Sequence, residues 1–262
     1  MSTIHTRPAE GLHPTMIARM LVLLYGVTVY LFFFGTFVYL VGFVGNWFVP
    51  KSIDSGPPAT SIGSAIAVDV LLLAAFAIQH TIMARPAFKE WWARYVPPAV
   101  ERSTFVLLAT AILAVLAWQW RPLPTVVWQV DDAVLAGLLN GISLAGWGIV
   151  LVATFLIDHF ELFGLRQTVS FALGQPDQHP AFKERLFYRW VRHPLMLGFL
   201  LAFWSTPVMT QGHLLFAAVT TAYVLLALHI EERTLVYLHG DRYRDYQRRV
   251  PMLLPFRKPG PR

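Results

Sequence analysis

Residues 16–43 read MIARMLVLLYGVTVYLFFFGTFVYLVGF and carry a single charge, at Arg19. About 20 consecutive apolar residues cross the hydrocarbon core of a bilayer as a helix, so this stretch is long enough to span a membrane. It is too long for a removable signal peptide and lacks the small-residue cleavage site of one. We therefore expect it to remain in the mature protein as a transmembrane helix.

Five further apolar stretches follow, each bounded by Pro, Gly or charged residues that end helices. They lie at Ile62–Met83, Ser103–Trp120, Ala133–Ile157, Pro194–Met209 and Leu214–Ile230. Only Thr210–His213 separates the last two, which predicts a tight helical hairpin. The sequence thus predicts an all-α fold: a polytopic integral-membrane helical bundle of five to six transmembrane helices, with a short C-terminal helical hairpin and a cytoplasmic amphipathic tail. No internal repeat divides the chain, so we expect residues 1–262 to form one domain.

The composition excludes several classes of protein. Hydrophobic residues make up 56% of the chain and charged residues 14%, whereas an ordinary soluble domain is about 25% charged. Together with a mean hydropathy of +0.52, this composition excludes a soluble globular enzyme, a disordered chain and a nucleic-acid-binding module. The absence of cysteine excludes disulfides, a thiolate nucleophile, iron–sulfur clusters and Cys-based zinc sites.

Basic residues flank alternate ends of the apolar stretches. Nineteen of the 21 Lys and Arg residues fall on one side of the predicted bundle, and only Lys51 and Arg121 fall on the other. Cytoplasmic loops of membrane proteins are enriched in Lys and Arg, so both termini and the loops 84–102 and 158–193 are predicted to be cytoplasmic. The net charge of +6 is then a feature of the membrane surface, and we expect membrane lipid rather than nucleic acid as a partner.

Ionisable residues inside apolar spans are candidates for function, because burying them in a membrane is costly. Asp69 and His80 share the second span, and eleven residues at 100° per residue return to within about 20° of one helix face. Asp69 is expected to be neutral or hydrogen-bonded to another helix. His80, at the cytoplasmic end, either lines a site or caps carbonyls at the membrane interface.

A polar cluster, Asp158–Gln167, follows the fourth span and contains His159, Glu161 and Arg166. If the helix continues, His159 and Glu161 lie about 200° apart and cannot face one pocket. No paired-His motif of the HExxH kind occurs, so we expect no metal site. No GxGxxG or GxxxxGK motif occurs, which excludes Rossmann and P-loop domains.

Opposite charges frame the predicted hairpin. Arg192, His193 and Pro194 open the fifth stretch, and free amides at a helix start beside a guanidinium suit a carboxylate. The sixth stretch ends in Glu231 and Glu232, which the hairpin returns to the same membrane face. Ordinary flanking charge with surface ion pairs explains the same pattern, and composition alone does not decide between the two interpretations.

The motif Arg192-His193-Pro194 with Gly198, followed by Glu231-Glu232 and by Tyr243 in the tail, resembles the C-terminal core of integral-membrane methyltransferases of the isoprenylcysteine carboxyl methyltransferase type. The stretch Gln79–Pro86, together with Phe88-Lys89, Trp92, Pro97 and Glu101–Thr104, resembles the nurim-related branch, and His159–Gln167 is similar to its bacterial methanethiol S-methyltransferases. This resemblance implies S-adenosylmethionine as cofactor, bound by a core at about 158–256, and a small thiol such as methanethiol as substrate. It also implies a multi-pass protein of the bacterial inner (cell) membrane.

The resemblance and the charges together suggest roles for individual residues. The cofactor site is expected to comprise Arg192, His193, Pro194, Gly198, Glu231, Glu232 and Tyr243. His80 and His159 are candidate bases for the thiol, Glu161 an orienting group and Arg166 a stabiliser of the thiolate. Two alternatives remain open: methylation of a lipid or isoprenylated acceptor, and a non-enzymatic membrane accessory protein.

The basic asymmetry yields a topological prediction. Reporter fusions after Ser55 and after Asp177 should report opposite sides of the membrane, with the second one cytoplasmic, because 158–193 is a basic loop. Reports from the same side would show that the predicted second and fourth spans are wrong.

Overall fold

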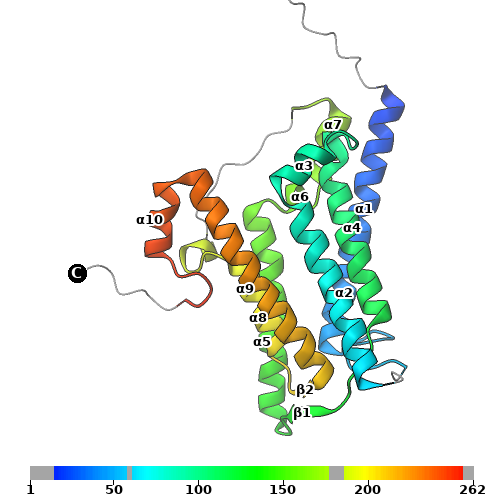
Figure 1. Cartoon of the computed structure of the whole chain (residues 1–262), viewed down its shortest axis with the longest axis vertical. Coiled ribbons are helices and arrows are strands. Elements are labelled where there is room, and N and C mark those ends of the chain that lie inside the picture. The colour runs from blue at the N-terminus through cyan, green and yellow to red at the C-terminus, as the bar shows by residue number, and fades with distance from the viewer. Residues whose placement is uncertain (1–14, 58–60, 177–185, 256–262) are drawn as a thin grey trace, which may run out of the picture.

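A computed structural model describes residues 15–57, 61–176 and 186–255 (Figure 1). Five helices are long and apolar enough to cross a membrane. They are α1 (Met16–Gly45), α2 (Ile62–Met83), α4 (Pro98–Gln119), α5 (Ala133–Ile157) and α9 (Gln211–His239). Five shorter helices join them: α3 (Pro86–Trp92), α6 (His159–Leu162), α7 (Leu165–Leu173), α8 (Pro194–Trp204) and α10 (Asp241–Arg249). The predicted all-α membrane bundle is thereby confirmed.

The remaining described elements are small. A 3-10 turn, η1, covers Leu186–Arg189. Two short strands, β1 (Val126–Gln129) and β2 (Val208–Thr210), pair antiparallel at one end of the bundle. Figure 1 shows α1, α2 and α4 on one side of the molecule and α5, α8 and α9 on the other.

Short polar side chains fix where the long helices begin. The hydroxyls of Thr15 and Thr210 accept hydrogen bonds from backbone amides in the first turns of α1 and α9. Ser61 forms a reciprocal capping box with Ser64 at the start of α2, and the Asp132 carboxylate caps α5. Such caps satisfy amides that have no partner within the helix.

The predicted fifth span is shorter than expected. A helix over Pro194–Met209 was predicted, but α8 has 11 residues and ends at Trp204. At 1.5 Å per residue it measures about 16 Å, too short for a core of about 30 Å. Residues 208–210 form the strand β2 instead of extending α8. Thr210, the last residue of β2, caps α9, so this strand is part of the connection between α8 and α9.

The short helix α8 packs closely against α5. A Cβ added at Gly198 would lie 2.7 Å from the carbonyl oxygen of Gly146, and one added at Gly146 would lie 2.6 Å from that of Gly198. Only glycine allows two helix backbones to approach so closely. This crossing fixes the position of α8, and hence of the Arg192-His193 segment that precedes it.

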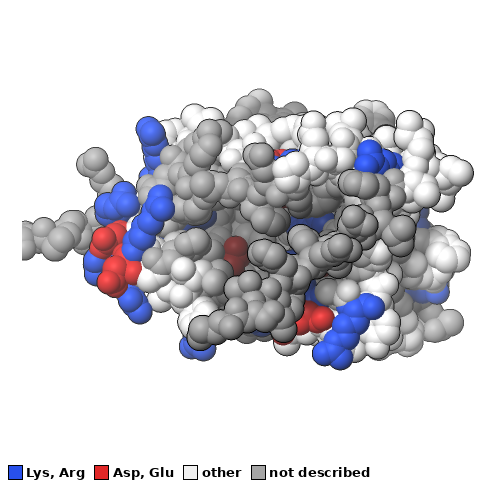
Figure 2. Space-filling model, turned by 90° about the horizontal axis from the view of Figure 1, so that it is seen from above, with Lys and Arg blue, Asp and Glu red and all other residues white. Residues whose placement is uncertain are grey.

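The polar groups concentrate at one end, which we call the charged end: the end where α1 and α4 begin and α2 and α5 terminate (Figure 1). Seen from above, Lys and Arg side chains are spread around this end, and the side chains of α10 gather at the left (Figure 2). Lys51 follows α1 and Arg121 follows α4, so both lie at the opposite end. Several residues counted in the basic asymmetry lie outside the described residues: Arg7, Lys183, Arg185, Arg257, Lys258 and Arg262.

Asp69 is fully buried, and its Oδ1 accepts the backbone N–H of Arg121 at 2.8 Å. Asp69 is thus hydrogen-bonded, but its partner belongs to the segment that follows α4 and not to another helix as expected. Asp69 is bonded to the segment after α4 at the opposite end, whereas His80 belongs to the last turn of α2 at the charged end.

Candidate functional site

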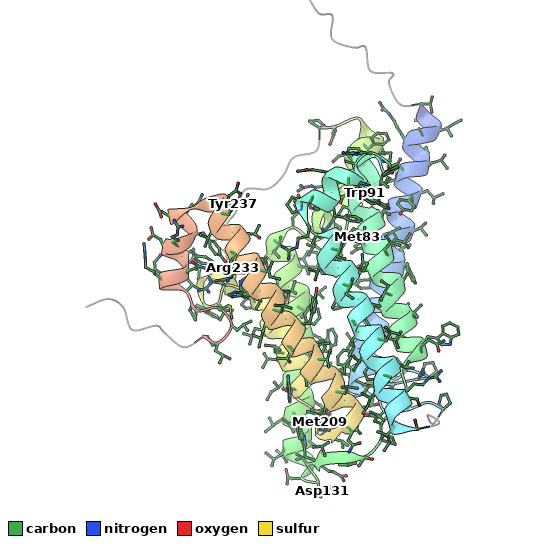
Figure 3. All side chains as sticks on the ribbon, in the orientation of Figure 1. Met83, Trp91, Asp131, Met209, Arg233 and Tyr237 are labelled. Carbon is green, nitrogen blue, oxygen red and sulfur yellow. The ribbon has the colours of Figure 1, made fainter. Side chains whose placement is uncertain are left out.

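Two groups of polar side chains occupy the charged end. The Glu232 cluster comprises Arg192, His193, Glu231, Glu232, Tyr243 and Gln247. The α6 cluster comprises Arg102, Asp158, His159, Glu161 and Arg166. In Figure 3, Arg233 and Tyr237 mark the end of α9 beside the first cluster, and Met83 and Trp91 mark the end of α2 and α3 beside the second.

The Glu232 carboxylate is the common acceptor of its cluster. Arg192 donates two parallel hydrogen bonds to it, from Nε to Oε1 at 2.6 Å and from Nη2 to Oε2 at 2.7 Å. His193 Nε2 lies 2.9 Å from Oε1, and the Tyr243 hydroxyl donates to the same oxygen at 3.1 Å. Gln247 Nε2 donates to Oε2 at 2.7 Å. One carboxylate on α9 therefore binds the start of α8 and two side chains of α10.

Arg192 also ties the C-terminal tail to the segment before α8. Its Nη1 donates to the carbonyls of Gln247 at 3.2 Å and Val250 at 2.5 Å, and its backbone amide donates to Pro251 at 2.9 Å. The side chain is only 6% exposed. A guanidinium has five N–H donors. The two bonds from Nη1 to carbonyls and the two bonds to Glu232 use four of them.

The neighbouring side chains differ in exposure and in charge. His193 is the N-cap residue of α8, but its ring bonds Glu232 and makes no capping hydrogen bond. Pro194 occupies the first helical position, where its missing N–H costs nothing. Glu231 is half-exposed, with Oε2 at 3.9 Å from His193 Nδ1. A partly exposed carboxylate thus lies directly beside a buried one.

Tyr243 of this cluster and the nearby Tyr188 are kept protonated. Burial raises the pKa of Tyr243 far above its usual value, and the negative charge of Glu232 adds to that effect. Burial likewise raises the pKa of Tyr188 to about 12, helped by the charge of Glu231. Tyr243 is therefore a permanent hydrogen-bond donor to Glu232 at physiological pH.

The α6 cluster begins where α5 breaks. Asp158, with φ of 169°, interrupts the helix, and its Oδ1 accepts the backbone amide of Glu161 at 3.0 Å. Arg166 pairs with two carboxylates, from Nη1 to Asp158 at 2.5 Å and from Nη2 to Glu161 at 2.8 Å. The positive charge of Arg166 is thus balanced by two negative neighbours.

His159 is buried, with both ring nitrogens hydrogen-bonded. Nε2 lies 2.9 Å from the Tyr30 hydroxyl and Nδ1 lies 2.8 Å from Thr154 Oγ1. Because the Thr154 hydroxyl donates to the Leu151 carbonyl at 2.6 Å, it accepts from Nδ1–H, and Nε2 accepts from Tyr30. Burial lowers the pKa of His159, although the charge of Asp158 opposes this. The imidazole is neutral and fixed in one tautomer.

His80 has a different environment. Its ring contacts those of Phe76 and Phe105, with centroid distances of 5.2 and 5.1 Å. Its Nδ1 is buried and has no hydrogen-bond partner among the described residues. Arg102 lies on the same Phe105 ring, at 4.9 Å from the centroid, and its Nε donates to the Leu162 carbonyl at 2.7 Å. The structure thus connects His80 to α6 through Phe105 and Arg102.

The structure also places residues to which the sequence assigned no role. Gln247, Arg102, Tyr30 and Thr154 each bond a predicted site residue or the backbone of α6. Arg102 carried a signal, since it is a cation at the edge of an apolar stretch; the others look like ordinary helix residues. Gly198 lies in the α5–α8 crossing, away from hydrogen-bonding groups of the cluster. In the described part of the chain, no three His, Asp or Glu side chains are grouped so that they could hold a metal ion.

Comparison with known proteins adds family information. A family model described as "Protein of unknown function (DUF1295)" matches residues 88–250. The chain is 55% identical to Methanethiol S-methyltransferase 2 of Bradyrhizobium diazoefficiens, over 92% of each chain. It is 51% identical to Methanethiol S-methyltransferase of Mycobacterium tuberculosis, over 91% of this chain and 97% of the relative. It is 28% identical to Nurim of Xenopus laevis, over 74% and 70% of the two chains. No solved structure matches the chain.

Two adjacent glutamates provide a matched test of the cluster. Glu232→Ala should lower the free energy of unfolding in detergent by about 3–5 kcal/mol, because it leaves the buried Arg192 without its counter-charge. Glu231→Ala should lower it by less than about 1 kcal/mol, because this side chain is half-exposed. Equal losses for the two variants would show that Glu232 does not hold α8, α9 and α10 together.

Proposed function

The chain belongs to the methanethiol S-methyltransferase family, and on that premise we propose that it methylates methanethiol to dimethyl sulfide. The observation that carries the proposal is the 47–55% identity to relatives of that name, over 90–98% of this chain. The absence of cysteine agrees with it, since direct transfer of a methyl group needs no protein nucleophile.

We propose S-adenosylmethionine as the methyl donor. Its amino-acid end carries a carboxylate and an ammonium group, and the donor set of the Glu232 cluster fits both. The half-exposed Glu231 suits the ammonium group, and the backbone amides after Pro194 with the remaining N–H of Arg192 suit the carboxylate. The assigned cofactor-binding residues are Arg192, His193, Pro194, Gly198, Glu231, Glu232 and Tyr243.

Within this set the residues divide into two kinds. Arg192 and Glu232 direct most of their hydrogen bonds at each other and at the tail, so their part is to shape the site. Glu231, which is half-exposed, is the carboxylate of this set that faces solvent. Gly198 contributes by letting α8 lie against α5.

The acceptor must lose its proton before it attacks. A free thiol has a pKa of about 8.5 or higher, so a neutral imidazole is a suitable base near pH 7. The bound S-adenosylmethionine supplies a methyl group carried by a sulfonium sulfur. A thiolate meeting that cation loses charge as the new bond forms, so a pocket that excludes water favours the reaction. His80 and His159 are the candidate bases.

We place the reaction at the cytoplasmic face of the bacterial inner membrane. Two observations support this placement: 19 of the 21 basic residues flank one side of the spans, and both polar clusters lie at the charged end. A protein at this face would draw the cofactor from the cytosol.

A methyl-transfer assay with purified protein tests the proposal. Methanethiol with S-adenosylmethionine should give dimethyl sulfide in the headspace, and omitting either compound should give none. Preference for a prenylcysteine or a phospholipid over methanethiol would overturn the substrate assignment. Absence of any binding of S-adenosylmethionine would favour a non-enzymatic accessory protein instead.

Calorimetric titration with S-adenosylmethionine tests the cofactor site. Arg192→Ala should weaken binding by about 2–5 kcal/mol, because it removes the buried, charge-assisted hydrogen bonds that hold the site in shape. The matched control is Arg248→Ala, whose partner Asp245 and own side chain are both exposed, and it should change binding by less than about 1 kcal/mol. Unchanged binding by a folded Arg192 variant would reject the assigned site.

A further inference from the structure

We propose that the acceptor thiol binds between His80 and Arg102, with His80 taking its proton and the Arg102 guanidinium stabilising the thiolate. This inference rests on the proposed function and names the acceptor site within it. It also assigns His159, Glu161 and Arg166 a positioning role.

The hydrogen bonding of the two histidines separates the candidate bases. Both nitrogens of His159 are engaged, by Tyr30 and Thr154, so His159 cannot take a proton without breaking an existing bond. In the described part of the chain, neither nitrogen of His80 has a hydrogen-bond partner, although Nδ1 is buried. An unsatisfied buried nitrogen costs free energy, and a site that receives a polar ligand explains its presence.

The two arginines differ in the same way. Arg166 already balances Asp158 and Glu161. Arg102 makes no ion pair with any described carboxylate, and only its Nε donates to a described residue, the Leu162 carbonyl. The four N–H groups of its Nη1 and Nη2 are therefore directed at no described partner. Glu101 and Glu161 act on Arg102 electrostatically, but neither forms an ion pair with it, so its Nη groups can donate hydrogen bonds to a thiolate.

The α6 cluster explains how Arg102 is held. Leu162, which accepts from Arg102, is the last residue of α6. His159, the first residue of α6, is hydrogen-bonded to Tyr30 of α1 and Thr154 of α5. Asp158 caps the short turn of α6. The polar residues of α6 thus fix the carbonyl that orients the guanidinium.

The walls of the proposed site indicate the class of acceptor. Phe76 and Phe105 both contact the His80 ring, and Tyr223 of α9 contacts Phe76. Aromatic rings around one imidazole favour a short alkyl group and exclude a bulky one. The acceptor is accordingly a small alkanethiol.

The atoms and charges of the step balance. The thiol proton moves to a ring nitrogen of His80, and the thiolate sulfur forms a bond to the methyl carbon. The bond between that carbon and the sulfonium sulfur breaks, and its electron pair stays on the leaving sulfur. A thioether, a neutral leaving thioether and a protonated imidazole result, and the imidazolium releases its proton to solvent.

A pair of thiols matched in length but not in acidity tests the role of Arg102. Arg102→Gln should lower kcat/KM for ethanethiol by about 10- to 100-fold, the effect of losing a charged hydrogen-bond donor. It should lower kcat/KM for the more acidic 2,2,2-trifluoroethanethiol by less than about 3-fold, because that thiolate needs less stabilisation. Arg102→Lys keeps the charge and should retain the wild-type ratio between the two thiols.

Two further variants show whether a loss is specific. Arg166→Gln should lower both rates by the same factor, as expected of a positioning residue. Arg94→Gln removes an exposed cation from the loop after α3 and should leave both rates unchanged. Titration with S-adenosylmethionine confirms that each variant is folded. Equal losses on both thiols for Arg102→Gln would overturn the inference, whereas a wild-type protein that does not methylate methanethiol would overturn the proposed function.

The pH profile tests His80 separately. Arg102 of α4 acts on the His80 ring electrostatically, and Tyr223 of α9 contacts Phe76, which stacks on that ring. His80→Asn should slow ethanethiol methylation most at low pH, where the thiol is protonated, and least at high pH, where the thiolate forms unaided. His159→Asn should lower the rate equally at every pH. The opposite pattern would make His159 the base and overturn the assignment.

Discussion

The arrangement of the C-terminal third depends on the contact between Arg192 and Glu232. Both side chains are largely buried, at 6% and 12% exposed, and two parallel hydrogen bonds join them. Desolvating two charges is expensive, and such a pair is stable only when further hydrogen bonds satisfy it, as His193, Tyr243 and Gln247 do here. Because these side chains come from the start of α8, from α9 and from α10, one ion pair fixes the relative positions of three helices, which apolar packing alone does not determine.

The same physical constraint separates the two polar clusters by role. In the Glu232 cluster the charges are mutually satisfied, so they build a rigid frame with Glu231 at its edge. In the α6 cluster, Arg166 pairs with two carboxylates and both ring nitrogens of His159 are hydrogen-bonded. Arg102 of the same cluster and the nearby His80 retain unused hydrogen-bonding capacity. A polar group left unsatisfied near the end of an apolar bundle is costly, and a functional requirement accounts for that cost.

Hydropathy and capping residues predict the five long helices because each must satisfy its own backbone in a membrane. They overestimate α8, since Pro194–Met209 is apolar throughout while residues 208–210 pair with β1. The charge pattern predicts that Arg192 and Glu232 lie at the same membrane face, but it does not predict that they bind each other. The Tyr30–His159 and Arg102–Leu162 contacts span 129 and 60 residues, and no local pattern encodes which helices become neighbours.

The central claim is a single direct transfer of methyl from the cofactor to a thiol held at the charged end, with no covalent protein intermediate. The stereochemistry at a chiral methyl group tests it most directly. One in-line displacement inverts the configuration, so S-adenosylmethionine carrying a methyl group labelled with hydrogen, deuterium and tritium should give a methyl thioether of inverted configuration. Retention of configuration would show two successive displacements through a protein nucleophile and would contradict the account.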